Sequence, residues 1–243
     1  FQAYTAMDVN GEFIVCWSSD GQDGDAYGVY AQRYNSDGTA KGNEFRVNTY
    51  TVDVQGLSSV ATNGNGDAIV VWQSNGQDGD GYGIYAQRYA DLDFVTAGSE
   101  FLVNTYTTND QKAWSTAMDE DGNFVIAWES YGQDGSEWEV YAQRYDSLGV
   151  AQGSEFLVNT HTTSDQRRPC VAMDPNGNFV VIWQSYSQDG DQGGIYGQRY
   201  DSSGTPQGSE FPVNQTTTNA QGNPTIAMDS DGNFVVTWDS NQN

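Results

Sequence analysis

The feature that most constrains the fold of this chain is a repeat of 55 or 56 residues that runs through all 243 residues. One repeat position holds Trp17, Trp72, Trp128, Trp183 and Trp238, and another holds Arg33, Arg88, Arg144 and Arg199. A fixed period of this length is typical of arrays whose units stack on one another. We therefore divide a single domain, 1–243, into repeats 1–55, 56–111, 112–166 and 167–221 and a half repeat 222–243.

Each repeat contains four short stretches with the composition of β-strands, separated by turn residues. Residues 225–229, 233–238, 84–89 and 100–104 exemplify the first to the fourth stretch. The second stretch is apolar on both faces, which indicates cover on both sides, and no stretch has helical periodicity. The pattern predicts an all-β fold, a β-propeller of four-stranded antiparallel blades. A linear β-solenoid is the alternative, but its repeats are usually shorter.

The number of blades follows from the number of repeats. All four stretches occur four times, and the first two occur a fifth time, which predicts five blades with an incomplete last blade. A four-bladed ring with an extra hairpin is the alternative. Because an exposed strand edge can pair with another chain, we expect the incomplete blade to mediate self-association, for instance into a filament. A chain that is a fragment of a longer repeat protein would explain the same count.

The charge balance restricts the partners. The chain has 9 basic and 33 acidic residues and a formal net charge of -24. Nucleic acid and anionic membrane surfaces require basic side chains, so neither is expected as a partner. No apolar run approaches the roughly 18 residues that a membrane helix needs, so no membrane insertion is expected. Such a charge suits cations, neutral glycans or solubility alone.

The loop between the second and third stretches gives the candidate site. It repeats as GQDGD, GQDGD, GQDGS and SQDGD. Its oxygen-bearing residues are Gln22, Asp23, Asp25, Gln77, Asp78, Asp80, Gln133, Asp134, Gln188, Asp189 and Asp191. In an up-and-down blade this loop emerges beside the loop that enters the next blade, and Tyr27, Tyr82 and Trp138 follow it. Polar groups beside aromatic rings are typical of sugar sites.

Three roles stay open for this rim of the ring. The side chains could brace one loop against the next, which is the interpretation that we favour. They could bind a glycan. The carboxylates Asp23, Asp25, Asp78, Asp80, Asp134, Asp189 and Asp191 could hold Ca²⁺, since hard cations prefer flexible, oxygen-rich loops. Calcium is the one cofactor that the sequence suggests.

The other repeated residues have structural interpretations. The five tryptophans lie on an apolar stretch and are expected to pack between blades. A buried arginine needs a partner, and we expect an aspartate on a neighbouring strand or loop to supply it. The turn between the first and second stretches, Asp229 to Asn233 in the last copy, begins like a calcium loop. A hairpin turn wants the same Asp, Asn and Gly residues, and we favour the turn.

The consensus unit xxAMDxDGNFVVxWxSxGQDGxxxxIYAQRYDxxGxxxGxEFxVNTxTxxxQ resembles the tandem repeats of large secreted bacterial surface proteins. It is also loosely similar to the blades of integrin-α-type and tachylectin-type propellers. The resemblance covers the whole chain and implies an extracellular or cell-surface β-propeller module without a catalytic role.

These observations predict a function without catalysis. No nucleophile and base, phosphate loop or zinc-ligand cluster stands out, and no catalytic residue is assigned. We expect an extracellular structural or adhesive module that associates with itself. A multivalent lectin with one weak site per blade is the alternative, and consistent binding to one sugar would favour it. A glycan-active enzyme is the third class, and turnover of a polysaccharide would reveal it.

Overall fold

The structure is a computed structural model that describes residues 3–90 and 95–241, and these form strands and no helix, so none that could cross a membrane. Blade 1 contains β1 (Ala3–Met7), β2 (Phe13–Asp20), β3 (Tyr27–Tyr34) and β4 (Phe45–Arg46). Blade 2 contains β5 (Gln55–Thr62), β6 (Ala68–Asn75), β7 (Tyr82–Ala90), β8 (Val95–Thr96) and β9 (Phe101–Leu102). Blade 3 contains β10 (Gln111–Met118), β11 (Phe124–Tyr131), β12 (Trp138–Tyr145) and β13 (Phe156–Leu157). Blade 4 contains β14 (Gln166–Met173), β15 (Phe179–Ser185), β16 (Gly194–Tyr200) and β17 (Phe211–Pro212). Blade 5 contains β18 (Gln221–Met228) and β19 (Phe234–Ser240).

The sheets confirm the predicted blades. The strands of each blade follow one another in chain order and pair antiparallel, and β18 and β19 form a two-stranded sheet. Two details differ from the expectation. The fourth strand is only two residues long, where five residues such as 100–104 were expected. Blade 2 carries the additional strand β8, which pairs with the end of β7.

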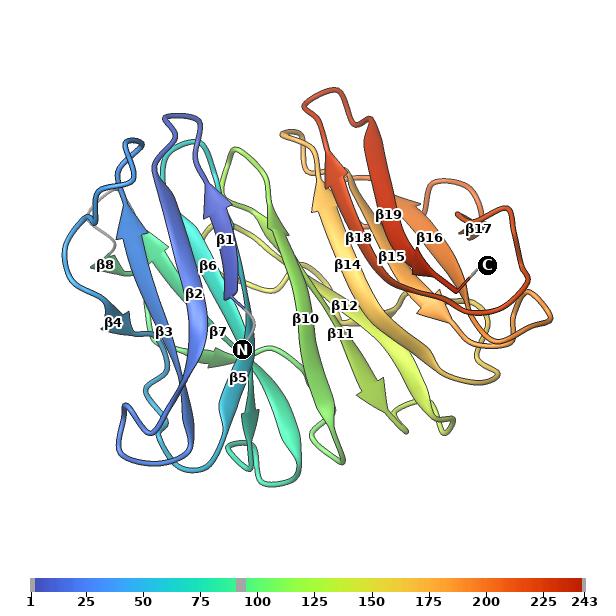
Figure 1. The fold of residues 1–243 in the computed structure, drawn as a ribbon, viewed down its shortest axis with the longest axis horizontal. Coiled ribbons are helices and arrows are strands. Elements are labelled where there is room, and N and C mark those ends of the chain that lie inside the picture. The colour runs from blue at the N-terminus through green and yellow to red at the C-terminus, as the bar shows by residue number, and fades with distance from the viewer. Residues whose placement is uncertain (1–2, 91–94, 242–243) are drawn as a thin grey trace.

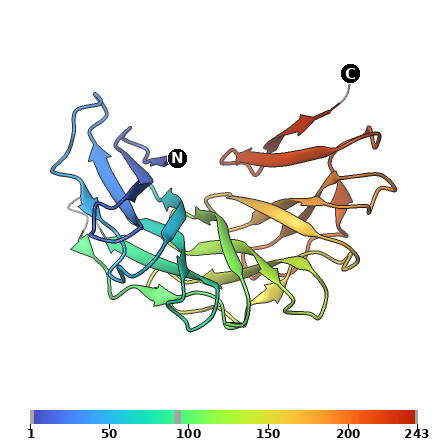
Figure 2. The same ribbon diagram turned by 60° about the horizontal axis from the view of Figure 1, so that its bottom comes forward.

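The blades are arranged side by side around an axis (Figure 1). The first strands β1, β5, β10, β14 and β18 are the inner strands, and those of successive blades, from β1 to β18, contact one another. Figure 2 shows that the five sheets form an arc, with blade 1 and the β18–β19 hairpin on either side of its open part. In each complete blade the first strand is inner and the fourth outer. The loops between second and third strands and the loops that enter the next blade emerge at the same end of the sheets, and together they form one rim.

The core lies between blades, which explains the doubly apolar second strand. β15 is buried along its whole length and β11 in all but its last residue, Tyr131, whereas β19 at the end of the arc is mostly exposed. Three apolar clusters fill the junctions of blades 1 and 2, 2 and 3, and 3 and 4. Trp72, Trp128 and Trp183 have no exposed surface, while Trp238 on β19 is 38% exposed. Burial of aromatic area against both neighbours therefore stabilises the interior blades most.

The turns between first and second strands are hairpin turns. In the blade 4 turn, the Asp174 carboxylate accepts hydrogen bonds from the backbone N–H groups of Asn176 and Asn178, at 2.8 and 3.0 Å. Gly177 has a φ of +83°, which a residue with a Cβ rarely adopts. The same two backbone contacts recur at Asp8 and Asp229. The Asp and Gly of this motif are thus used by the turn itself.

Candidate functional site

The candidate site is the rim where second-to-third-strand loops and interblade loops emerge. Each predicted glutamine there donates to a glutamate before the fourth strand of its own blade. The pairs are Gln22–Glu44 at 2.6 Å, Gln77–Glu100 at 2.6 Å, Gln133–Glu155 at 2.5 Å and Gln188–Glu210 at 2.5 Å. In three of these blades the other glutamate oxygen accepts from a threonine of the preceding blade, as Glu100 does from Thr49 at 2.6 Å. These glutamines help to join neighbouring blades.

The second aspartate of the loop motif holds the loop that enters the next blade. The carboxylates of Asp25, Asp80 and Asp191 accept from the backbone N–H groups of Asp53, Asn109 and Asn219, at 3.0, 3.0 and 2.8 Å. The three donor residues have φ angles of +63°, +61° and +62°, so the contact stabilises a left-handed turn. The geometry gives these aspartates a bracing role, and their role as ligand residues stays a prediction.

The first aspartate of the motif lies under its loop. A Cβ on Gly83 would lie 2.5 Å from the Asp78 carboxylate. A Cβ on Gly28 would lie 2.6 Å from Asp23, and one on Gly194 would lie 2.7 Å from Asp189. Both carboxylate oxygens of Asp23 and both of Asp78 are buried. Burial raises the pKa of Asp78. Each of these blades therefore buries one carboxyl group against a glycine of its third strand.

Blade 3 also buries a carboxyl group at this place, but it comes from the third strand and not from the loop. Glu139 replaces the glycine, and its own carboxyl group is fully buried. It accepts hydrogen bonds from the Ser136 hydroxyl at 2.7 Å and from the Asn159 amide. Burial raises the pKa of Glu139 to about 7. Asp134, the loop aspartate of this blade, is exposed and accepts from Ser136 instead.

The calcium prediction stays untested. Among residues 3–90 and 95–241, no three His, Cys, Asp or Glu side chains gather as metal ligands would. Several of the predicted carboxylate ligands are engaged by backbone N–H groups, as described above.

The repeat symmetry is broken at the rim above blades 2 to 4. The residue after the first glutamine of the inner strand is Gly56 in blade 2 and Gly222 in blade 5, but Lys112 in blade 3 and Arg167 in blade 4. The Lys112 ammonium lies 4.8 Å from the centre of the Trp138 ring and 5.9 Å from that of Tyr82. The Arg167 guanidinium lies 4.5 Å from the Trp138 ring. We call Tyr82, Lys112, Trp138, Arg167 and Glu129 the rim cluster.

Every cation of the rim cluster has an acidic partner. Glu129 on β11 is 1% exposed and accepts from Arg167 through both oxygens, at 2.9 and 3.3 Å. The Lys112 ammonium lies 3.3 Å from the Asp110 carboxylate. Such paired groups are fixed in orientation and keep donors and acceptors at the surface. The adjacent Tyr131 is 41% exposed, and its ring lies 5.3 Å from that of Trp138.

Only part of this cluster was predicted from the sequence. Tyr82 and Trp138 were expected as rim aromatics, whereas Lys112, Glu129 and Arg167 were not. The signal that could have found them is their departure from the repeat, because Glu129 stands where blades 2 and 4 have glutamine. The expected aspartate partner does not accept from Arg88 and Arg144, which donate to backbone carbonyls of the next blade. Arg33 lies 3.9 Å from the Glu12 carboxylate.

The two glutamates of blade 3 do not form a catalytic pair. In the register of β11 and β12, Glu129 is opposite Val140 and Glu139 is opposite Ser130. Side chains on neighbouring positions of a strand point to opposite faces, so Glu129 and Glu139 face different neighbouring blades. A glycosidase needs its two carboxyl groups on either side of one bond.

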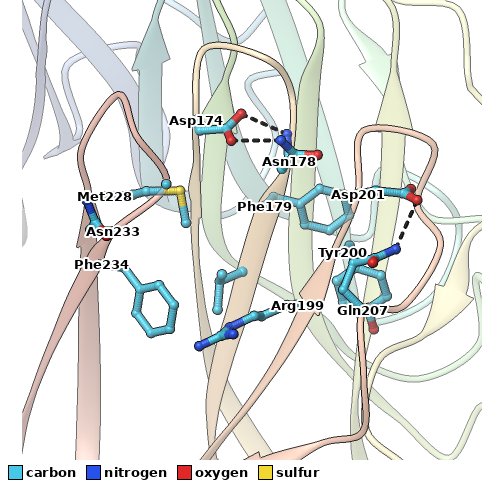
Figure 3. A pocket seen from close by; sticks show the side chains of 12 residues that line it. Asp174, Asn178, Phe179, Arg199, Tyr200, Asp201, Gln207, Met228, Asn233 and Phe234 are labelled. Carbon is cyan, nitrogen blue, oxygen red and sulfur yellow. Dashed lines mark hydrogen bonds between the residues drawn. The ribbon is translucent and has the colours of Figure 1, made fainter.

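A cavity of about 560 Å³ lies between blade 4 and the β18–β19 hairpin (Figure 3). Phe179, Arg199, Tyr200 and Phe234 line it, and Phe234 and Arg199 face each other across it. Arg199 and Tyr200 recur in every complete repeat, and the phenylalanine recurs in all but the second, which has Ala68. The cavity is therefore an unfilled blade junction and not a departure from the repeat.

The fold defines the protein as a β-propeller, and the comparisons with solved structures agree. It is similar to a protein of unknown function from Dyadobacter fermentans (TM-score 0.66, 10% identity, 97% of this chain and 74% of that one). It is similar to a polysaccharide lyase of family PL25, an ulvan lyase (TM-score 0.63, 10% identity, 98% of this chain and 63% of that one). It is also similar to the GH93 α-L-arabinofuranosidase of Fusarium graminearum in complex with arabinobiose (TM-score 0.62, 13% identity, 97% of this chain and 73% of that one). Identities this low establish the fold alone.

No family model and no curated protein matches the chain. The propeller resemblance is thus confirmed at the level of the fold, while the kinship with secreted surface-protein repeats stays a resemblance. The predictions of a structural or adhesive module and of a protein that is not an enzyme are wrong in the light of these neighbours. Solved structures with this fold include a glycosidase and a polysaccharide lyase, so a repeated blade architecture gives no ground for excluding catalysis. Self-association is not tested by these findings.

Proposed function

We propose that the protein binds a carbohydrate at the rim cluster. The observation that carries this proposal is the break in repeat symmetry: aromatic rings and paired charges meet above blades 2 to 4. A ligand that is held at one place needs unlike groups there, whereas blade packing needs the same groups in every blade. The proposal therefore places one main site on the rim, in contrast to one equivalent site in each blade.

The chemistry of the cluster suits a neutral sugar. Lys112 and Arg167 each have a carboxylate partner, so the site offers hydrogen bonds without an excess positive charge. The partly exposed ring of Tyr131 offers an apolar face to the C–H groups of a sugar ring, and its hydroxyl offers a hydrogen bond. The net charge of -24 further disfavours an anionic ligand. The GH93 neighbour, whose complex contains arabinobiose, supports the ligand class by analogy of fold.

Two variants test the proposal with a matched control. We expect Trp138→Ala and Lys112→Ala to weaken glycan binding at least tenfold, because Lys112 and Arg167 both rest against the Trp138 ring. Lys41 is the other lysine of the chain and lies away from this rim, where its ammonium forms an ion pair with Glu12 at 2.5 Å. Lys41→Ala is therefore expected to bind normally. Binding is measured by calorimetry, with arabinobiose as the first probe and a glycan array to find better ligands.

The outcome that would contradict the proposal is equal binding by all three variants, or no binding to any glycan on the array. The same incubations are read for new reducing ends, which tests turnover, and are repeated with calcium and with EDTA. The extracellular location and the calcium dependence remain predictions.

A further inference from the structure

Two complete blade junctions, those of blades 2 and 3 and of blades 3 and 4, share one aromatic arrangement. At the junction of blades 2 and 3, the Tyr145 ring lies 4.9 Å from Phe124 of its own blade and 5.5 Å from Phe101 of the preceding blade. The Tyr145 hydroxyl donates to the Val103 carbonyl at 3.3 Å. At the junction of blades 3 and 4, Tyr200 makes the same contacts with Phe179, Phe156 and Val158. A tyrosine at the end of a third strand thus packs between two phenylalanines at both junctions, while at the junction of blades 1 and 2 Tyr89 packs on Phe45 and is opposite Ala68.

The same junctions share an arginine contact. Arg88 of blade 2 donates to the Leu148 carbonyl at 2.5 Å and to the Ser147 carbonyl, both in the turn after the third strand of blade 3. Arg144 of blade 3 donates in the same way to Ser202 and Ser203 of blade 4. The arginine of one blade therefore recognises two successive carbonyls of a turn that follows a tyrosine.

The junction beyond blade 4 has the two phenylalanines and the arginine of this arrangement. Among residues 3–90 and 95–241, it has neither the tyrosine nor the turn that they contact elsewhere. Phe211 and Phe234 lie 6.5 Å apart, at the positions where Phe101 and Phe124 flank Tyr145. The Arg199 guanidinium lies 5.3 and 5.2 Å from these two rings, and within the described chain it donates to no carbonyl as Arg88 and Arg144 do. In this part of the structure, β19 pairs only with β18, and Val235 and Trp238 are 61% and 38% exposed.

We propose that the cavity between blade 4 and β19 is a docking site for an extended polypeptide segment that ends in a tyrosine followed by an Asp-x-x-Gly turn. The segment adds to the free edge of β19 through main-chain hydrogen bonds. Its tyrosine ring inserts between Phe211 and Phe234 and displaces the Arg199 guanidinium from them. The freed guanidinium then donates to the two carbonyls of the turn. The occupant is specified by what fills the equivalent space at the other junctions.

The test uses a synthetic peptide with the sequence of residues 194–209, GIYGQRYDSSGTPQGS, which carries the tyrosine and the turn. We expect saturable binding to the full chain by fluorescence anisotropy, weakened at least tenfold in Arg199→Ala and in Phe234→Ala. Arg46→Ala, an exposed arginine on β4, is the matched control and is expected to bind normally. A peptide with alanine in place of the tyrosine is expected to bind at least tenfold more weakly.

Amide hydrogen exchange gives a second readout that does not depend on the variants. The peptide is expected to slow exchange along β19 and to leave β1 unchanged. Equal binding of the alanine peptide, protection elsewhere, or no binding at 1 mM peptide would overturn the proposal. A stable dimer without peptide, abolished by Phe234→Ala, would also overturn it, because the surface would then belong to a second copy of the chain.

Discussion

Replacing Trp128 with alanine is expected to lower the free energy of unfolding by about 3–5 kcal/mol, the usual range for a buried large aromatic side chain. Trp128 has no exposed surface and packs in the apolar cluster between blades 2 and 3. Sheets lie on both sides of the indole, and their ladders of hydrogen bonds resist collapse into the space that alanine leaves. The loss is measured by urea unfolding followed by circular dichroism.

Trp238→Ala is the matched control, because Trp238 occupies the same repeat position on β19 but is 38% exposed. Its free energy of unfolding is expected to fall by about 1 kcal/mol, since folding buries less apolar area at this site. If Trp128→Ala does not fold, Trp128→Phe and Trp238→Phe provide the same comparison with smaller cavities. Equal losses at the two positions would contradict the conclusion that stability depends on the neighbours of each blade.

Glu139→Gln is expected to stabilise the protein at pH 8 and to flatten its stability between about pH 4.5 and 7. Burial raises the pKa of Glu139 from 4.5 to about 7 in the folded protein. The folded state therefore binds a proton more tightly than the unfolded state, so this group's contribution is full below the unfolded pKa and is lost as pH rises through 7. Above pH 7 the buried carboxylate costs roughly 3 kcal/mol, which the uncharged amide avoids.

The surroundings of Glu139 can accept the amide. Asn159 donates to one oxygen of Glu139, and the Ser136 hydroxyl, which now donates to the other, can accept instead. Asp134 and Asp165 are the nearby acids that disfavour the ionised form.

Glu137→Gln is the control for Glu139→Gln, because Glu137 is an exposed glutamate of the same loop. It removes one of the 33 acidic residues and so matches the change in general repulsion. Melting temperatures at pH 5 and pH 8 separate the two variants. We expect wild type and Glu137→Gln to melt several degrees higher at pH 5 than at pH 8, with a smaller difference for Glu139→Gln. The same pH dependence in all three would exclude Glu139 as its source.

The candidate site shows where sequence reasoning stops. The loops with the GQDGD motif were predicted as a repeated polar rim, yet each glutamine and the second aspartates Asp25, Asp80 and Asp191 form hydrogen bonds within the protein. The first aspartate is buried against a glycine of the third strand, and only the structure shows that Glu139 fills the equivalent space in blade 3. A repeated motif marks what every blade needs, so residues that depart from the repeat are better candidates for a ligand.

The sequence by itself determined the all-β class, the repeated unit of strands and its turns, because these depend on local alternation, turn chemistry and a period that is visible in the chain. Tertiary structure alone decided which side chains of different blades meet. Lys112 and Arg167 reach the Trp138 ring only because successive blades are set side by side with a particular stagger. That placement follows from how buried side chains interlock across each junction. Interlocking depends on shape in three dimensions, which a one-dimensional period does not contain.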